Sequence, residues 1–359
     1  MKNPKRIRKR FFISLLVLIT ILVFLQTGYI IWNTADPSKT CASCHEIRPS
    51  YDKWASSAHR ASDCKTCHGT ALSKGMRSIK DISGRILRHF SHDSLTEVRL
   101  NEKQVGKMVD LCAECHQNEF SKWLTGGHSM RFTDVFLNQS QNKKVLPDQQ
   151  CLHCHGMFYE GPVDELVSPV DTTGPWHIVS SMHEVRYAMP CLACHSIHTP
   201  GLTRISPDYA NPEQKAYNLP ATYPKAGFYD NITKRYFRAD ELSPVHTLQE
   251  DTTLLVSEDP LMRICFQCHT PDASHHARTV DDHLPAGVHE GLSCTACHQT
   301  HANDAMKSCR LCHPAISNCG LDVEKMNTTF ADPGSPNDIH KVSCMDCHPG
   351  FIRKQNKPD

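Results

Sequence analysis

Eighteen of the 19 cysteines form nine Cys-x-x-Cys pairs, and each pair is followed directly by a histidine. The cysteines are Cys41, Cys44, Cys64, Cys67, Cys112, Cys115, Cys151, Cys154, Cys191, Cys194, Cys265, Cys268, Cys294, Cys297, Cys309, Cys312, Cys344 and Cys347. The histidines are His45, His68, His116, His155, His195, His269, His298, His313 and His348. At this spacing both thiols reach one edge of a porphyrin as thioethers, and the adjacent imidazole binds the iron. The pattern, numbered motif 1 to motif 9 in chain order, predicts nine covalently bound c-type haems with these histidines as proximal iron ligands.

Cys-x-x-Cys pairs also occur in zinc sites, redox dithiols and disulfide scaffolds. A zinc protein has no reason to place histidine after every pair, and a thioredoxin-like dithiol would be a single pair in a βαβ unit. Disulfide scaffolds are small secreted chains, whereas this chain has 359 residues and an odd number of cysteines. Haem attachment is therefore the favoured interpretation, and Cys319 is left over as an expected buried, unreactive thiol.

Fifteen of the 24 histidines lie outside the proximal positions, enough for a second axial ligand at every haem. His198 and His301 each follow a motif histidine by three residues, too close to reach round their own haem. We expect such a histidine to cap a neighbouring haem. The candidate distal ligands are His59, His89, His128, His183, His198, His246, His289, His301 and His340. For any one of them, a surface or hydrogen-bonded histidine is the alternative.

Six basic residues and no acidic ones precede an uncharged run from Phe11 to Trp32. These 22 residues would form a helix of about 33 Å, against a bilayer hydrocarbon core of about 30 Å. The alternative is a cleaved signal peptide, but its apolar region would be shorter and would end at a small-residue site. The run predicts a transmembrane anchor, with the basic N-terminus in the cytoplasm and the remainder exported.

The formal net charge of +1 is an average of two unlike parts. Taking the six basic residues of the tail from the 39 Lys and Arg leaves 33 against 38 Asp and Glu, a net −5 for the exported part. An acidic exported part does not favour a nucleic-acid partner.

The fold class predicted is mostly α with extensive irregular loops, a single N-terminal transmembrane helix and then an elongated multihaem cytochrome c domain. Only 39% of residues are hydrophobic and 7% aromatic, which suits a core made largely of porphyrin. The motifs recur at irregular intervals, so a solenoid is not indicated. The expected divisions are 1–10 basic tail, 11–32 anchor, 33–130 haem region with three motifs and 131–359 haem region with six, including a haem-free loop at about 199–260.

Two helices are expected near the anchor. Pro49 to His59 should form a short helix entered at proline. Lys74 to Phe90 has apolar residues at near-helical spacing and five basic residues, which suits either a helix on the membrane surface or a helix packed on the haem core.

The segment from the anchor to motif 2 resembles the NapC/NirT/NrfH family of membrane-anchored multihaem quinol dehydrogenases. The resemblance covers roughly residues 5–92 and includes the stretch Cys41 to Pro49, Trp54, Ser57 and His59. It implies a haem domain that takes electrons from menaquinol or ubiquinol and passes them to a periplasmic reductase. Family members often carry a methionine where this chain has Ile47, so the first haem needs another distal ligand or stays open.

The resemblance also implies a quinol site after motif 2. Lys74, Lys80 and Asp81 lie in the matching segment, where a lysine and a carboxylate could bind the quinol oxygen and accept its proton. The alternative is that they are surface charges on an amphipathic helix.

Two functions follow. The first is electron transfer from the quinol pool through nine haems to a periplasmic or outer-membrane acceptor in anaerobic respiration. The protein would then lie in the bacterial inner membrane, with its haem domain in the periplasm. The second is a terminal reductase that acts on a nitrogen or sulfur oxyanion at one five-coordinate haem. The surplus of histidines favours the first, because a six-coordinate iron has no place for a substrate.

Overall fold

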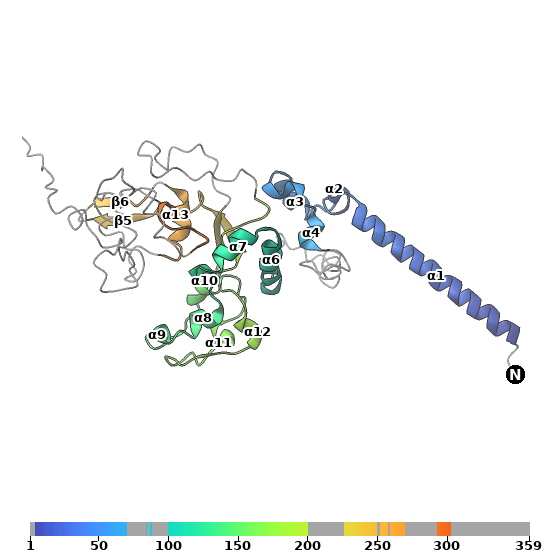
Figure 1. The fold of residues 1–359 in the computed structure, drawn as a ribbon, viewed down its shortest axis with the longest axis horizontal. Helices are drawn as coiled ribbons and strands as arrows, with labels where there is room; N and C mark the ends of the chain where they lie inside the picture. The colour runs from blue at the N-terminus through green and yellow to red at the C-terminus, as the bar shows by residue number, and fades with distance from the viewer. Residues whose placement is uncertain are drawn as a thin grey trace, which may run out of the picture. The chain divides into compact units, whose positions relative to one another are not determined.

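We analysed a computed structural model, which describes residues 4–69, 84, 87, 100–199, 226–249, 252–257, 259–269 and 293–302. Contacts divide the chain into two compact units, residues 1–99 and 100–359. The described residues are mostly helical, with a few short strands, as the sequence predicted (Figure 1).

Unit 1 begins with the long helix α1 (Pro4–Thr34). Its segment Arg8–Ile31 has 24 residues and a mean hydropathy of 2.4, and none of it is buried inside the protein. At about 1.5 Å rise per residue this segment is about 36 Å long, enough for a hydrocarbon core of about 30 Å. The apolar run at 11–32 therefore forms one continuous helix that is long and apolar enough to cross a membrane.

Short helices follow α1, and each starts at a recognisable residue. They are α2 (Pro37–Thr40), α3 (Arg48–Ala55), η1 (Ala58–Ala61) and α4 (Cys64–His68). Proline stands in the first turn of α3, as expected. The Ser57 hydroxyl accepts the N–H of His59 at 3.1 Å, and the Asp63 carboxylate accepts the N–H of Lys65 at 2.8 Å. The helix expected at Lys74 to Phe90 lies outside the described residues, apart from Gly84 and Leu87.

Among the residues of unit 2 that the structure describes, there is one helix of four turns and many shorter ones. Its described helices are α6 (Glu102–Cys115), α7 (Gln117–Trp123), η2 (Gly127–Ser129), α8 (Phe132–Phe136), α9 (Gln139–Asn142), α10 (Cys151–His155), α11 (Val163–Leu166), α12 (Ser181–Glu184), η3 (Cys191–Ala193), α13 (Pro260–Cys265) and η5 (Cys294–Ala296). A reciprocal capping box between Asn101 and Gln104 starts α6. Short helices thus carry most of the described motifs, which confirms the expectation.

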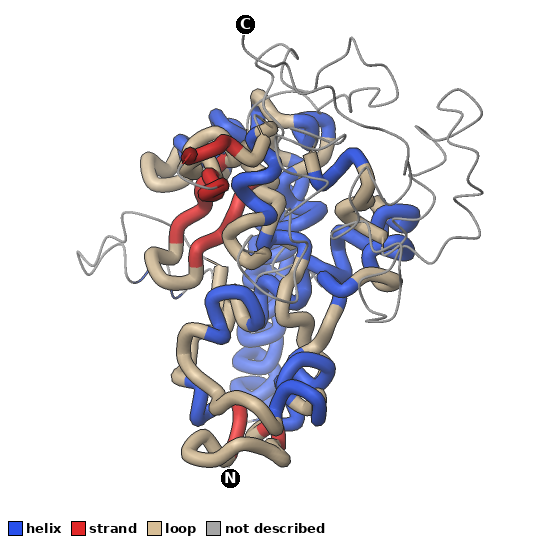
Figure 2. The backbone as a smooth tube through the Cα atoms, turned by 90° about the vertical axis from the view of Figure 1, so that its left-hand side faces the viewer, coloured by secondary structure: helices blue, strands red, loops and turns tan. Residues whose placement is uncertain are grey.

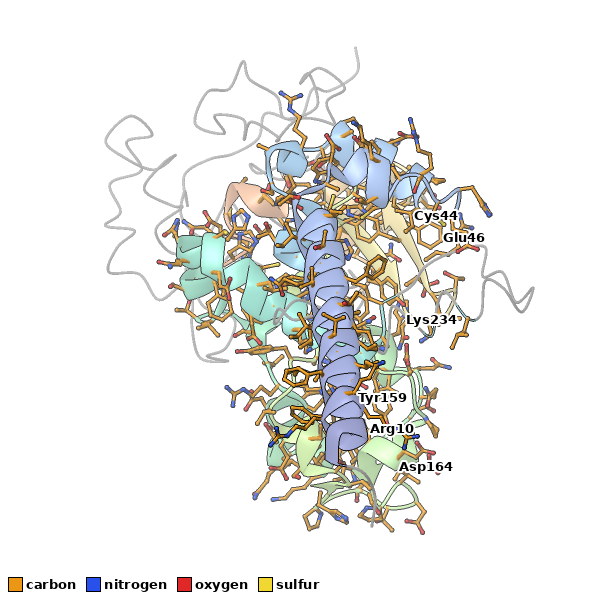
Figure 3. The ribbon with its side chains drawn as sticks, turned by 90° about the vertical axis from the view of Figure 1, so that its right-hand side faces the viewer. Arg10, Cys44, Glu46, Tyr159, Asp164 and Lys234 are labelled. Atoms are coloured by element: carbon orange, nitrogen blue, oxygen red, sulfur yellow. The ribbon has the colours of Figure 1, made fainter. Side chains whose placement is uncertain are left out.

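The main apolar cluster of unit 2 surrounds α10, the helix of motif 4. Its buried members are Phe132, Phe136, Leu152, Tyr159, Leu166, Val167, Trp176, Ile178 and Ala188. Burial, together with the carboxylates of Glu165, Glu102 and Asp164, raises the pKa of Tyr159 to about 12 (Figure 3). A smaller cluster of Met157, Ala193 and Phe228 joins the residues just after motif 4 and the middle of motif 5 to the strand Gly227–Asp230.

The described strands form short antiparallel pairs among helices and loops (Figure 2). They are β1 (Val167–Ser168) with β2 (His177–Ile178), β3 (Gly227–Asp230) with β4 (Arg235–Arg238), and β5 (His246–Gln249) with β6 (Thr252–Leu255). The last two pairs lie where the sequence suggested a haem-free loop. Aromatic residues favour strands, and Phe228 faces Phe237 across the β3–β4 pair.

The β3–β4 turn is held by side chains. Asp230 accepts hydrogen bonds from the N–H groups of Ile232 at 3.0 Å and Thr233 at 3.1 Å. Lys234 adopts a φ of 57° and donates to the Asn231 side chain (Figure 3). The turn therefore fixes the position of the Asn231 side chain.

Candidate haem sites

The backbone of each described motif forms about one helical turn. In motifs 1, 5, 6 and 7 the N–H of the second cysteine donates to the carbonyl of the first at 3.2 or 3.3 Å. In motifs 3, 5, 6 and 7 the histidine N–H donates to that same carbonyl at 2.7 to 3.0 Å. In motifs 2 and 4, the helices α4 and α10 begin at the first cysteine and end at the histidine. Helical residues at positions i, i+3 and i+4 share a face, so both thiols and the imidazole project to the same side.

The thiols have the chemistry and the exposure that thioether attachment needs. All fourteen described cysteines are free thiols, and in this part of the chain none is in a disulfide. Thirteen of them are half-buried, and Cys115 is exposed. A planar cofactor bonded at one edge requires thiols that it can reach, and none of these fourteen residues is fully buried. The residues present therefore fit a c-type haem at each described motif.

Motifs far apart in the sequence lie against one another within unit 2. The thiols of Cys112 and Cys191 are in hydrogen-bonding contact, and so are those of Cys154 and Cys268. A third contact joins Cys265 to Cys294, and its hydrogen bond lowers the pKa of Cys265. These contacts connect motif 3 to motif 5, motif 4 to motif 6, and motif 6 to motif 7.

Motifs 5 and 6 are also close to each other. Burial raises the pKa of the Cys194 thiol to about 12, and the nearby Cys265 thiol adds to the rise. Motifs 3 to 7 therefore form one connected group. In unit 1, burial raises the pKa of Cys64, and the proximity of Cys41 adds to it, so motifs 1 and 2 are neighbours as well.

The β3–β4 hairpin holds motifs 4 and 5. The Tyr236 hydroxyl donates to the carbonyl of Cys194 at 2.6 Å, and the N–H of Gly227 donates to the same carbonyl at 2.9 Å. Burial raises the pKa of the Tyr236 phenol, which keeps its proton on the oxygen for this bond. The amide of Asn231 donates to the carbonyls of Leu152 at 3.4 Å and Gly156 at 3.2 Å. Sequence reasoning missed these contacts, since only the folded hairpin brings its residues to the motifs.

Two proximal histidines each face a histidine from another part of the chain. The ring centres of His195 and His301 are 5.8 Å apart, with planes at 24°. Those of His128 and His269 are 6.2 Å apart, with planes at 55°. Burial lowers the pKa of His195 to about 4, and its proximity to His301 and His116 adds to the effect. Burial also lowers the pKa of His301. A neutral imidazole has the free lone pair that an iron ligand needs.

The other candidate distal ligands have different surroundings. His183 lies on α12 with its Nε2 3.7 Å from a Glu102 carboxylate oxygen and its ring against Tyr159. His59 is half-buried in η1, and His198 is half-buried after motif 5. His246 is exposed on β5.

Part of the predicted site lies outside the described residues. This applies to motifs 8 and 9, with Cys309, Cys312, His313, Cys344, Cys347 and His348, and to the candidate ligands His89, His289 and His340. It also applies to the expected quinol-site residues Lys74, Lys80 and Asp81, and to Cys319. All of these stay predictions.

Residues 3–163 match the N-terminal region of the NapC/NirT cytochrome c family. Together with helix α1, the match defines the class: a membrane-anchored multihaem cytochrome of electron transfer, located in the inner membrane. The chain is thus a c-type cytochrome, with covalently bound haem, whose N-terminal region is of the NapC/NirT type. The matched part includes motifs 1 to 4 and extends beyond residues 5–92, the part of the chain with the resemblance described above. Searches of curated proteins and of solved structures found no match.

Proposed function

We propose that this protein carries nine haems and transfers electrons from the quinol pool to a periplasmic or outer-membrane acceptor in anaerobic respiration. The observation that carries the proposal is the set of contacts between motifs. Motif 3 connects to motif 5 through Cys112 and Cys191, motif 4 to motif 6 through Cys154 and Cys268, and motif 6 to motif 7 through Cys265 and Cys294. The proximity of Cys194 to Cys265 joins motif 5 to motif 6. Haems attached to touching motifs lie close to one another, which electron transfer along a chain of cofactors requires.

The protein's own residues have three tasks in this function. The cysteines tether each macrocycle at one edge, and the following histidine supplies the proximal imidazole. The hairpin contacts of Tyr236 and Asn231 keep motifs 4 and 5 at a constant spacing. When bound, the haem iron supplies one-electron redox chemistry.

Electrons would enter at unit 1, next to the membrane. The six basic residues that precede the apolar run at 11–32 favour a cytoplasmic N-terminus, and motifs 1 and 2 would then lie at the periplasmic side of the bilayer. Lys74, Lys80 and Asp81 follow motif 2 in the sequence and would bind the quinol and accept its proton. Their proximity to the anchor along the chain supports this assignment.

The haem count is tested by the mass of the intact purified protein, compared with that of the polypeptide alone. Nine covalent haems are expected, and peptide mapping should find one on each motif. A Cys347→Ser, Cys344→Ser double variant should carry eight. A count below nine in the unaltered protein would contradict the nonahaem proposal.

Electron entry is tested with membranes that contain the protein. A menaquinol analogue should reduce the haems, and Lys80→Met together with Asp81→Asn should slow the reduction at least tenfold. Lys53→Met, an exposed substitution on α3, is the control and should leave the rate unchanged. Reduction by a soluble donor only would show that the quinol assignment is wrong.

The reductase alternative is distinguished by electron paramagnetic resonance of the oxidised protein. Electron transfer by six-coordinate haems predicts low-spin ferric signals alone. A substantial high-spin signal that shifts on addition of nitrite or a sulfur oxyanion would instead indicate a five-coordinate, substrate-binding haem.

A further inference from the structure

We infer that His301 is the distal iron ligand of the haem on motif 5 and that His128 is the distal ligand of the haem on motif 6. The inference rests on the proposed haem attachment and goes further, because it states which histidine completes which site. It makes the short segment after motif 7 part of two other haem sites.

The distances between ring centres match two imidazoles on opposite sides of one iron. A metal–imidazole nitrogen bond is about 2 Å long, and the nitrogen lies about 1 Å from its ring centre, so the two centres are about 6 Å apart. The observed separations are 5.8 Å for His195 with His301 and 6.2 Å for His128 with His269. In each pair one member is the proximal histidine of a motif. If these were ordinary contacts between aromatic rings, we would not expect both pairs to include the proximal histidine of a motif.

The first pair is supported by where its members come from. His195 closes motif 5, while His301 lies in the turn after η5, where the Ala302 N–H donates to the Gln299 carbonyl at 3.1 Å. The contact of Cys265 with Cys294 holds the start of motif 7 against motif 6. A histidine three residues beyond its own motif thus reaches another motif.

The second pair has an independent support in the hydrogen bonding of His128. Its Nδ1 lies 3.4 Å from the backbone carbonyl oxygen of Thr300. A carbonyl oxygen can only accept, so Nδ1 carries the proton in this long hydrogen bond, and in the neutral imidazole Nε2 then keeps its lone pair. Iron-bound histidines usually have their second nitrogen bonded in this way, which fixes the tautomer and the ring orientation.

Thr300 and His301 are adjacent, so one short segment serves both sites. Its histidine ring faces His195, and its carbonyl orients the ring that faces His269. The segment directly follows His298, the proximal ligand of a third haem. Loss of order in this segment would therefore change the axial coordination of the haems on motifs 5 and 6 together.

The experiment compares His301→Ala, His128→Ala and the double variant in the purified full-length holoprotein. Mass and peptide mapping should first show the same number and positions of haems as in the unaltered protein. Each single variant should then convert one haem from low-spin to high-spin ferric in its paramagnetic resonance spectrum, and the double variant should convert two. Added imidazole should restore the low-spin signal, because it can occupy the vacated position.

His177→Ala is the matched control, because His177 is exposed on β2. It should leave every haem low-spin. His301→Met provides a second measurement that does not rely on an emptied site. Methionine as an axial ligand keeps the iron low-spin but raises its reduction potential, so one haem should titrate at a higher potential. A purely structural role of His301 would not produce this change.

The results separate this inference from the proposal on which it rests. Missing haem on motif 5 or 6 of the unaltered protein would contradict haem attachment at these sites. A full haem count with unchanged low-spin spectra in His301→Ala and His128→Ala would overturn the ligand assignment and leave haem attachment intact. A methionine variant with unchanged potentials would likewise overturn the assignment of His301.

Discussion

The ammonium group of Lys65 donates a hydrogen bond to the backbone carbonyl of Ala35 at 3.0 Å. Lys65 lies between the two cysteines of motif 2, and Ala35 follows directly after the last residue of α1. The bond therefore connects the second haem-attachment site to the end of the membrane helix within unit 1. It also satisfies a carbonyl at a helix C-terminus, where a positive charge is favourable.

Lys65→Met should remove this bond and keep most of the side-chain volume. A partly buried bond of this type contributes about 1 kcal/mol, so amide hydrogens of residues 35–40 should exchange about fivefold faster. Hydrogen exchange on the detergent-solubilised holoprotein measures this effect. Lys53→Met, on the exposed side of α3, should leave these rates unchanged, and equal effects of the two variants would contradict the proposed role.

Glu102→Gln should destabilise the start of α6. Glu102 forms an ion pair with Arg186 and lies 3.7 Å from the Nε2 of His183, and all three side chains are largely buried. Removing one charge leaves the arginine without its partner in a poorly solvated place, at a cost of about 2 to 3 kcal/mol. Urea unfolding followed by far-ultraviolet circular dichroism should show a lower midpoint. Asp110→Asn, on the exposed face of α6, is the control, and a comparable loss there would argue against the ion pair.

Tyr236→Phe should loosen the β3–β4 hairpin from motif 5. The substitution keeps the ring and removes the hydroxyl that donates to the Cys194 carbonyl, a loss of about 1 to 1.5 kcal/mol. Hydrogen exchange at the Gly227 amide, which donates to the same carbonyl, should accelerate correspondingly. Tyr187→Phe preserves the ring contact with Trp123 and serves as the comparison. Unchanged exchange at Gly227 would show that the hydroxyl does not hold the hairpin.

Two Gly→Ala substitutions should change the stability of the fold in opposite directions. A Cβ on Gly227 would lie 2.2 Å from the Phe237 carbonyl oxygen, so the strand would have to shift, and stability should fall by more than about 2 kcal/mol. A Cβ on Gly106, inside α6, would meet nothing within 4 Å. Alanine there should stabilise the helix by about 0.5 to 1 kcal/mol. Urea midpoints compare the two, and a stable Gly227→Ala protein would mean that the strands are less closely paired than the structure shows.

Asp230→Asn should change how stability depends on pH. Burial opposes ionisation of Asp230, but hydrogen bonds from Thr233 and Ile232 outweigh it and lower the pKa of the carboxyl below its ordinary 3.8. The folded protein therefore holds the carboxylate more strongly than the unfolded chain. The ionised carboxylate therefore adds to the free energy of unfolding at pH values above 3.8, and this stabilisation is lost as the pH falls from there through the folded-state pKa.

The measurement is the difference in unfolding free energy between the unaltered protein and Asp230→Asn at pH 6, 4 and 3. The difference should be largest at pH 6 and shrink toward pH 3. Asp171→Asn, an exposed control, should show no such trend. A difference that grows as the solution is acidified would contradict the role of the carboxylate as a hydrogen-bond acceptor in the turn.

Local features were predictable because neighbouring residues decide them. The apolar run at 11–32 predicted one long helix, since its composition and length suffice for that structure. Proline at the start of α3 and the short helical turns at the motifs follow in the same way. The β3–β4 and β5–β6 hairpins were missed, because their stability comes from pairing across a turn and, for β3–β4, from packing on motifs 4 and 5.

The sequence by itself determined the chemistry of this protein: the Cys-x-x-Cys-His spacing requires only residues within one turn, and the basic tail with its apolar run specifies an anchor. Tertiary structure alone decided which motifs touch and which histidines meet. Nine of the fifteen non-proximal histidines were candidate distal ligands in the sequence, with no haem assigned to any of them, whereas folding brought His301 to His195 and His128 to His269. The reason is that these pairs join segments far apart along the chain, and their proximity depends on the packing of every element between them.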